Sequence, residues 1–141
     1  MQSAKFLKLA ISILLLVVIA AFTGCGGTTL GGSDFCGFWV NEDTDTQGIT
    51  KVDIQKIGDI IYVHMWGKCH PTDCDWGIET TNNSDATDGI LNLTWEFDFA
   101  IETQELILLS DGRLKVIAFC HFTDNSGRPD YESIEFFIKE Y

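Results

Sequence analysis

The feature that most constrains this chain is a strict alternation of apolar and polar residues near its centre. Between residues 91 and 99 the odd positions are apolar and the even positions are polar. Successive side chains of a β-strand point to opposite faces, so this period of two predicts one buried and one solvent-facing side. The predicted buried set is Leu91, Leu93, Trp95, Phe97 and Phe99.

The same period recurs along the chain. The even positions between residues 114 and 122 are apolar, which predicts another strand of this kind. In the last segment the pattern predicts that Ile134, Phe136 and Ile138 face the core, and that the polar residues between them face solvent. With shorter runs of the same type, the sequence predicts eight strands, near 36–41, 48–57, 59–68, 74–80, 89–99, 104–110, 113–123 and 130–140.

Turn residues separate these segments. Asp111-Gly112 and Gly58-Asp59 each stand between apolar runs and predict tight hairpins, because glycine accepts the positive φ that such turns need. Eight short sequential strands are typical of an up-and-down barrel or a two-sheet sandwich. Closure is favoured because it leaves no exposed sheet edges. We therefore predict an all-β fold, a single antiparallel up-and-down eight-stranded barrel over residues 35–141.

The first predicted strand begins with Gly37-Phe38-Trp39. A G-x-W sequence at this position resembles the opening of the calycin-type barrels, the group that contains lipocalins and avidins. The resemblance implies an eight-stranded barrel in which the side chain of Trp39 plugs one end.

The first 24 residues have the composition of an export signal. Lys5 and Lys8 give a positive start, and residues 9–22 are apolar except for Ser12. This apolar stretch is shorter than the roughly 20 residues that a transmembrane helix needs. The alternatives to a lipoprotein signal are an ordinary cleaved signal peptide and an uncleaved anchor.

The end of this segment, Phe22-Thr23-Gly24-Cys25, resembles the lipobox of bacterial lipoproteins, with Phe22 where Leu, Val or Ile is usual. The resemblance implies cleavage before Cys25, acyl chains such as palmitate on that residue, and attachment to a membrane of the bacterial cell envelope. The absence of Asp at position 26 favours the outer membrane, facing the periplasm or the cell surface. We expect a lipoprotein signal peptide (1–24), a lipidated cysteine with a Gly/Thr-rich tether (25–34) and the folded domain (35–141).

Two longer stretches are similar to a motif pair in a group of uncharacterised secreted domains. The first is Trp66-Gly67-Lys68-Cys69-His70-Pro71-Thr72-Asp73-Cys74-Asp75-Trp76-Gly77, and the second runs from His121 to Tyr131. The resemblance covers about residues 37–140 and implies kinship without implying an activity.

The chain has five cysteines, and the expected export signal places them in an oxidising compartment, where disulfides form. With Cys25 assigned to the lipid, four cysteines remain and three pairings are possible. Cys69 and Cys74 bracket the tip of a predicted hairpin, so a disulfide between them would clamp the loop. Cys36 with Cys120 would then join the first predicted strand to the seventh.

The same region offers a rival metal site. Thiolate and imidazole are ligands that zinc prefers, and the available set is Cys69, Cys74, His64, His70 and His121. The C-x4-C spacing and an oxidising compartment favour the disulfide, so we predict no metal and no cofactor. The run Asp43 to Gly48 imitates the start of a calcium loop, but Ile54 stands where that loop needs its closing Glu.

Trp66 and Trp76 flank the loop that the predicted disulfide would clamp, one on each arm of its hairpin. They either pack across the strands as a structural pair or line the mouth of the barrel, where small-ligand pockets commonly lie. The candidate binding residues are therefore Trp66, His70, Asp73, Asp75 and Trp76.

The net charge and the absence of known catalytic patterns exclude several classes of function. The chain has 21 acidic and 9 basic residues, a net charge of −12, and so acidic a surface repels nucleic acid. The sequence has no Ser-His-Asp, phosphate-binding or dinucleotide-binding pattern. We expect a non-enzymatic binding module, held at the membrane by its lipid, that takes a small ligand at the barrel mouth or a protein at the 69–74 loop. The alternative is a secreted-side hydrolase or metal-dependent enzyme that uses loop Asp and His residues.

Overall fold

The computed structural model describes residues 31–141, and its architecture is the predicted one, all-β and antiparallel. The elements are β1 (Gly37–Asn41), β2 (Ile49–Ile57), β3 (Ile60–Gly67), β4 (Cys74–Asn82), the 3-10 helix η1 (Asn83–Asp85), β5 (Ile90–Phe97), β6 (Ala100–Leu108), β7 (Leu114–Phe122) and β8 (Tyr131–Glu140). Cys25, the expected signal peptide and the first part of the expected tether lie outside the described residues. Within residues 31–141, no helix is long and apolar enough to cross a membrane.

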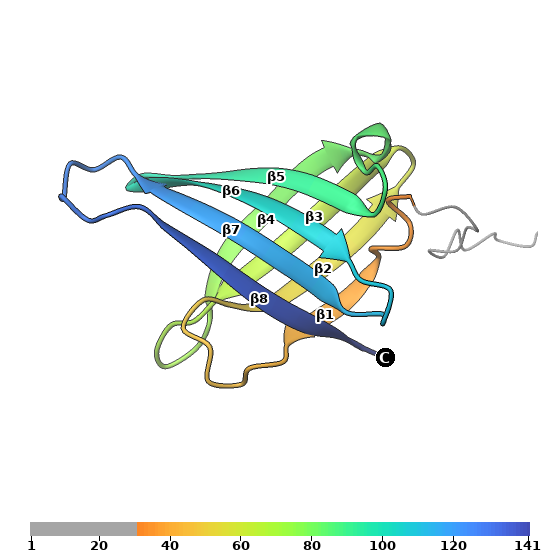
Figure 1. The fold of residues 1–141 in the computed structure, drawn as a ribbon, viewed down its shortest axis with the longest axis horizontal. Coiled ribbons are helices and arrows are strands. Elements are labelled where there is room, and N and C mark those ends of the chain that lie inside the picture. Colours follow the sequence, from red (N-terminus) through yellow and green to blue (C-terminus); the bar gives the residue numbers. More distant parts are fainter. Residues whose placement is uncertain (1–30) are drawn as a thin grey trace, which may run out of the picture.

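The eight strands form one nearly closed barrel. Their order in the sheet is β4-β3-β2-β1-β8-β7-β6-β5, and the first strand pairs with the last, with Phe38 opposite Glu140. The two ends of this order, β4 and β5, lie next to each other without a hydrogen-bonded ladder. We call this gap the seam. Figure 1 shows β5 to β8 lying across β1 to β4, with one core between the two halves, an arrangement consistent with a calycin-like fold.

The up-and-down order gives the barrel two different ends. The β2–β3, β4–β5 and β6–β7 connections lie at one end, with the C-terminus and the start of β1, and we call it the closed end (Figure 1). The β1–β2, β3–β4, β5–β6 and β7–β8 connections lie at the other end, which we call the mouth. The predicted hairpin turns at Gly58 and Gly112 are both found at the closed end, and both glycines have a positive φ.

Trp39 fills the closed end, in the position that the G-x-W resemblance implies. Its side chain is 1% exposed, and its indole N–H donates a hydrogen bond of 2.9 Å to the backbone oxygen of Phe35, which is itself buried. The Lys139 Nζ lies 4.7 Å from the centre of a Trp39 ring and donates to the backbone oxygen of Cys36. Large apolar side chains with satisfied polar atoms therefore close this end.

The inward faces of β5 to β8 form layers of residues that lie directly opposite one another. From the middle of the barrel towards the mouth, the layers are Leu91-Leu106-Val116-Glu135, then Leu93-Gln104-Ala118-Ser133, then Trp95-Glu102-Cys120-Tyr131. The inward side chains of β6 to β8 thus become polar, and several of them small, towards the mouth.

The largest difference from the predicted strand boundaries lies between β5 and β6. The strand predicted over 89–99 ends at Phe97, and the next begins at Ala100 rather than at 104. Asp98-Phe99 is a two-residue connection, and Phe99 is 46% exposed. Neither residue is glycine or proline, so the apolar alternation runs into the turn without a break.

The face of β8 is the reverse of the prediction. Ile134 and Ile138 are 49% and 46% exposed, whereas Ser133 and Glu135 line the interior. The buried residue is Phe137. Pairing with β7 and β1 fixes the register, and a shift of one residue exchanges the two faces of a strand, so neighbouring strands decide which set is buried.

Candidate functional site

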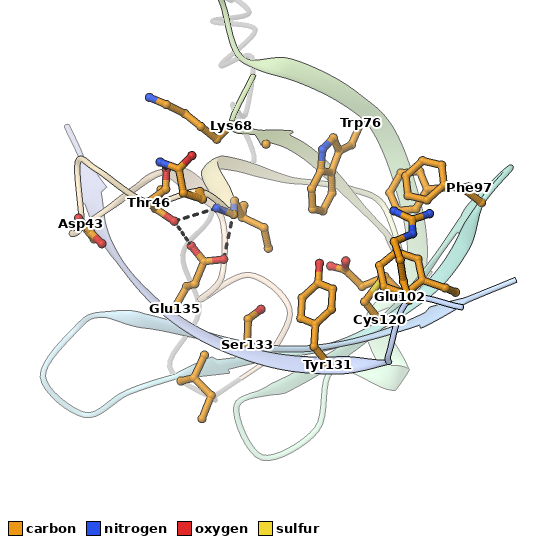
Figure 2. A pocket seen from close by; sticks show the side chains of 18 of the residues that line it. Asp43, Thr46, Lys68, Trp76, Phe97, Glu102, Cys120, Tyr131, Ser133 and Glu135 are labelled. Carbon is orange, nitrogen blue, oxygen red and sulfur yellow. Dashed lines mark hydrogen bonds between the residues drawn. The ribbon is translucent and has the colours of Figure 1, made fainter. Parts of the chain in front are cut away.

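A cavity of about 770 Å³ opens at the mouth of the barrel (Figure 2). Its volume lies within the roughly 300–1,000 Å³ typical of small-molecule sites. Its wall carries five aromatic residues, Trp76, Phe97, Phe99, Phe122 and Tyr131. Its charged residues are Asp43, Asp45, Glu102, Glu135, Lys68 and Arg128.

Short side chains leave this space open. Cys120 and Ser133 point inward from β7 and β8, where larger residues would fill the barrel. On the opposite wall, a Cβ at Gly67 would lie 2.5 Å from the indole nitrogen of Trp76. Glycine is therefore needed at position 67, because the Trp76 ring lies against the backbone there.

A β-bulge turns Trp76 into the cavity. Met65 lies opposite Gly77 and Trp66 lies opposite Asp75, so Trp76 is the extra residue of β4. Gly77 has a φ of 88°, a conformation that favours glycine. Of the two alternatives for the tryptophans, the packing of Trp66 against Trp76 is wrong, since the bulge places the two rings on opposite faces of the hairpin, and Trp76 lines the mouth.

The Trp76 ring also joins the two strands of the seam. Its ring centre lies 6.0 Å from that of Trp95 and 5.5 Å from that of Phe97, both in edge-on geometry. Both partners belong to β5, which has no backbone ladder with β4. Aromatic packing thus holds the seam together beside the mouth.

A chain of hydrogen bonds leads from the core to the cavity. The indole N–H of Trp95 donates to Gln104 Oε1 at 3.0 Å, and Gln104 Nε2 donates to Glu102 Oε1 at 2.6 Å. Glu102 is 6% exposed and lines the cavity. Burial raises the pKa of the Glu102 carboxyl, and the nearby Glu135 raises it further, while the hydrogen bond from Gln104 acts in the opposite direction.

Two neutral groups adjoin this carboxyl. Cys120 lies opposite Glu102 on one side and opposite Tyr131 on the other. Burial raises the pKa of the Cys120 thiol, and burial together with Cys120 raises the pKa of Tyr131 to about 12. Figure 2 shows the Tyr131 hydroxyl beside Glu102, with Trp76 across the cavity. The site thus presents hydroxyl, thiol and carboxyl groups against an aromatic wall.

Glu135, the other inward carboxylate of the cavity, has a structural role. It accepts hydrogen bonds from Asn41 Nδ2 at 2.5 Å, Thr46 Oγ1 at 2.8 Å and the backbone N–H of Ile49 at 3.0 Å. These contacts attach the β1–β2 connection to β8 (Figure 2). Because protein donors occupy its oxygens, Glu135 shapes the rim of the cavity.

An arginine already rests on the aromatic rim. The guanidinium carbon of Arg128 lies 3.9 Å from the centre of the Phe122 ring and 5.6 Å from that of Phe99. Its Nη2 is 2.6 Å from Asp124 Oδ2. The faces of these rings can therefore accept a cation.

The predicted Cys69–Cys74 disulfide is confirmed, with a Cα–Cα distance of 5.4 Å. It closes the β3–β4 connection, which lies at the mouth and exposes His70 at its tip. Asp73 accepts hydrogen bonds from Lys51 Nζ at 2.7 Å and Thr50 Oγ1 at 3.0 Å, and these bonds lower the pKa of Asp73. The loop is thus fixed by a covalent bond and an ion pair.

Trp66 and Asp75 lie on the outside of the barrel. Asp75 Oδ1 is 2.6 Å from His64 Nε2, and the rings of His64 and Trp66 stack with centres 3.8 Å apart. Of the five candidate binding residues, Trp76 alone lines the mouth cavity, while Trp66, His70, Asp73 and Asp75 do not.

The predicted disulfide between Cys36 and Cys120 is wrong. Cys120 is a free, buried thiol opposite Tyr131, the first residue of β8. Cys36 lies two residues before Phe38, which faces Glu140 near the other end of β8. A strand rises about 3.3 Å per residue, so β8 separates the two sulfurs by far more than a disulfide spans.

The rival metal site loses two of its ligands, because Cys69 and Cys74 are joined to each other. Across the described part of the chain, no three His, Cys, Asp or Glu residues are placed to hold a metal ion.

The predicted binding residues did not include the inward polar residues of this end of the barrel, namely Glu102, Gln104, Cys120, Tyr131 and Ser133. The alternation within residues 100–108 carries a signal for Glu102 and Gln104, because both share their parity with the buried Leu106. Because the strand was predicted to start at residue 104, Glu102 fell outside it and was not recognised as an inward residue.

Comparisons with models of protein families, with curated proteins and with solved structures find no match to this chain.

Proposed function

We propose that this protein is a lipid-anchored extracytoplasmic binding protein that takes a small, partly apolar molecule into the mouth of its barrel. The observation that carries the proposal is the cavity of about 770 Å³. An aromatic wall with a few convergent polar groups is the usual composition of a small-ligand site. The aromatic wall buries the apolar part of the ligand, and the polar groups of Glu102, Tyr131 and Ser133 orient it.

The chemistry of the cavity favours binding over catalysis. A nucleophilic cysteine works as a thiolate, and burial raises the pKa of the Cys120 thiol and keeps it protonated. Tyr131, with a pKa of about 12, is equally unsuited to act as a base at neutral pH. The two described histidines that form ion pairs, His64 and His121, do not line the cavity.

The point at which the chain reaches the barrel determines how an anchored protein would be oriented. Gly32 lies against the side chain of Ile61 near the start of β3, at the closed end. A tether that continues from this point towards a lipidated Cys25 leaves the mouth at the opposite end. The mouth then faces away from the membrane, and the clamped 69–74 loop forms part of its rim.

The binding proposal is tested with N-phenyl-1-naphthylamine, an uncharged dye that fluoresces in apolar sites. Ser133→Trp fills the cavity with an indole, and Thr103→Trp places the same side chain on the exposed face of β6. We expect dye binding to wild type and to Thr103→Trp, and at least about tenfold weaker binding to Ser133→Trp. Equal binding to all three proteins, or to none, would contradict the proposal.

The anchor is tested by labelling with fatty acid in a bacterial host. Cys25→Ala should give a longer precursor that takes up no label. Mass spectrometry of the wild-type chain should find Cys25 as the first residue, carrying acyl chains. A Cys25 recovered in a disulfide would contradict the anchor, because one sulfur cannot carry both a thioether and a disulfide.

A further inference from the structure

We infer that the mouth cavity selects organic cations, namely apolar or aromatic molecules with one ammonium group that binds against Glu102 and Tyr131. This inference rests on the proposed function and names the chemical class of its ligand. The geometry that carries it is a buried carboxyl group at the base of an aromatic cavity.

The charge of the cavity favours a cation. Four carboxyl-bearing residues line it, against two basic ones, and the basic Arg128 is already paired with Asp124. The whole chain has a net charge of −12. A cleft lined mainly by one sign of charge concentrates ligands of the opposite sign, so an anionic ligand is disfavoured at the rim and at the base.

Glu102 lacks a cationic partner. Among the described residues no ion pair includes it, and its protein hydrogen bond comes from the neutral amide of Gln104. A buried carboxylate without a countercharge is destabilising, whereas a buried carboxylate paired with an ammonium group is tolerated. A ligand cation would supply the missing partner, and Gln104 holds the carboxyl in a fixed orientation.

The aromatic wall suits the rest of such a ligand. Trp76 lies across the cavity from Tyr131 (Figure 2), and Phe97, Phe99 and Phe122 also line the cavity. Arg128 over Phe122 shows that a cation fits against these rings. A neutral ligand would gain the same apolar burial but would leave the Glu102 carboxyl unpaired.

The affinity for a cation at this position should depend on pH. The groups packed around Glu102 are Trp95 on β5, Gln104 on β6, Cys120 on β7, and Tyr131 and Glu135 on β8. None of these side chains carries a positive charge. The basic residues that line the same cavity are Lys68 and Arg128, and Arg128 is paired with Asp124. Because burial raises the pKa of Glu102, lowering the pH protonates the carboxyl and removes the ligand's countercharge, so affinity for the cation rises with pH.

The test compares three fluorescent probes of one scaffold: dansylcadaverine, which has a free amine, its N-acetyl derivative, and the corresponding dansyl aminohexanoic acid. Each is titrated into the full-length protein in mild detergent, with Ser133→Trp in the same detergent as the reference for nonspecific uptake. We expect the amine to bind at least about tenfold more tightly than the N-acetyl derivative, and the acid to bind most weakly.

Matched variants locate the selectivity. Glu102→Gln should lower the affinity for the amine to that for the N-acetyl derivative, whereas Glu105→Gln, on the exposed face of the same strand, should leave the preference intact. Equal wild-type affinities for the amine and the N-acetyl derivative, or a preference that survives Glu102→Gln, would overturn the inference and leave the proposed function standing. Binding of no probe above the reference would overturn both.

If Glu102→Gln does not fold, the pH dependence of ligand binding to the wild-type protein tests the inference instead. The wild-type affinity for the amine should rise as the pH increases above 4.5, the ordinary pKa of a glutamate carboxyl, while that for the N-acetyl derivative stays flat. A flat profile for the amine would also overturn the inference.

Discussion

The two ends of the barrel use the same strands in opposite ways. At the closed end, the indole N–H of Trp39 is satisfied by a backbone oxygen and its ring fills the core. At the mouth, the indole N–H of the equally buried Trp95 begins a polar chain that ends on Glu102 in a cavity. Large side chains close one end, whereas short and polar ones hold the other open. The comparison separates residues needed for folding from residues available for binding.

The largest expected loss of stability comes from the closed end. Trp39→Ala should lower the free energy of unfolding by about 3–5 kcal/mol, the usual cost of removing a buried tryptophan. Chemical denaturation measures it, with Trp66→Ala on the outer face as the control. Similar losses from the two variants would contradict the assignment of Trp39 to the closed core.

Trp76→Ala should separate stability from binding. Its two edge-on aromatic contacts contribute about 1–3 kcal/mol together beyond the burial of apolar area, and the ring is only partly buried, so the variant should still fold. Dye binding should weaken by at least about tenfold because the cavity loses part of its wall. Denaturation and dye titration of the same preparation give both quantities. Full affinity in a destabilised variant would make Trp76 a seam residue without a part in binding.

Removal of the disulfide should affect stability alone. Replacing Cys69 and Cys74 together by Ser opens a short loop, and the chain-entropy model gives a cost of at most about 2 kcal/mol. The melting temperature should fall while dye affinity changes by less than about threefold, because neither cysteine lines the cavity. A larger loss of affinity would move the binding site to the loop.

Smaller effects come from the titration of carboxyl groups, the first of them Glu102 in the ligand-free protein. A raised pKa means that the stability from the protonated carboxyl is complete below its ordinary value of 4.5 and is lost as pH rises through the folded-state pKa. The advantage of wild type over Glu102→Gln in unfolding free energy should therefore shrink as pH increases. Denaturation of both proteins across this range measures the trend, and an advantage that grows with pH would reverse the assigned cause.

Asp73 should show the opposite dependence. Hydrogen bonds from Lys51 and Thr50 lower its pKa, so its contribution is present above the ordinary value of 3.8 and is lost as pH falls through the lowered one. The pH dependence from Asp73 thus reports on the outer rim, and that from Glu102 reports on the inner cavity.

Local chemistry explains which features could be predicted from the sequence. Gly58 and Gly112 mark their hairpins because few other residues adopt their positive φ. Leu91, Leu93 and Trp95 are buried as predicted, since one face of β5 is uniformly apolar. The Cys69–Cys74 disulfide follows from a spacing that suits a hairpin tip.

The site was harder to predict because its determinants are not local. Phe136 and Phe137 are adjacent, so the sequence allows either face of β8 to be buried, and pairing with β1 and β7 decides. The bulge that turns Trp76 inward depends on the register between β3 and β4. Glu102 is recognisable as an inward carboxyl only once the turn at Asp98-Phe99 is placed.

The central claim is that ligand binds inside the mouth, and amide chemical-shift mapping of the full-length protein tests it most directly. Titration with N-phenyl-1-naphthylamine should shift the amide signals of Gly67, Phe99, Cys120 and Tyr131, which surround the cavity. The signals of Trp39 and its neighbours at the closed end should stay in place. Shifts confined to the closed end, or to the tip of the 69–74 loop, would contradict the claim.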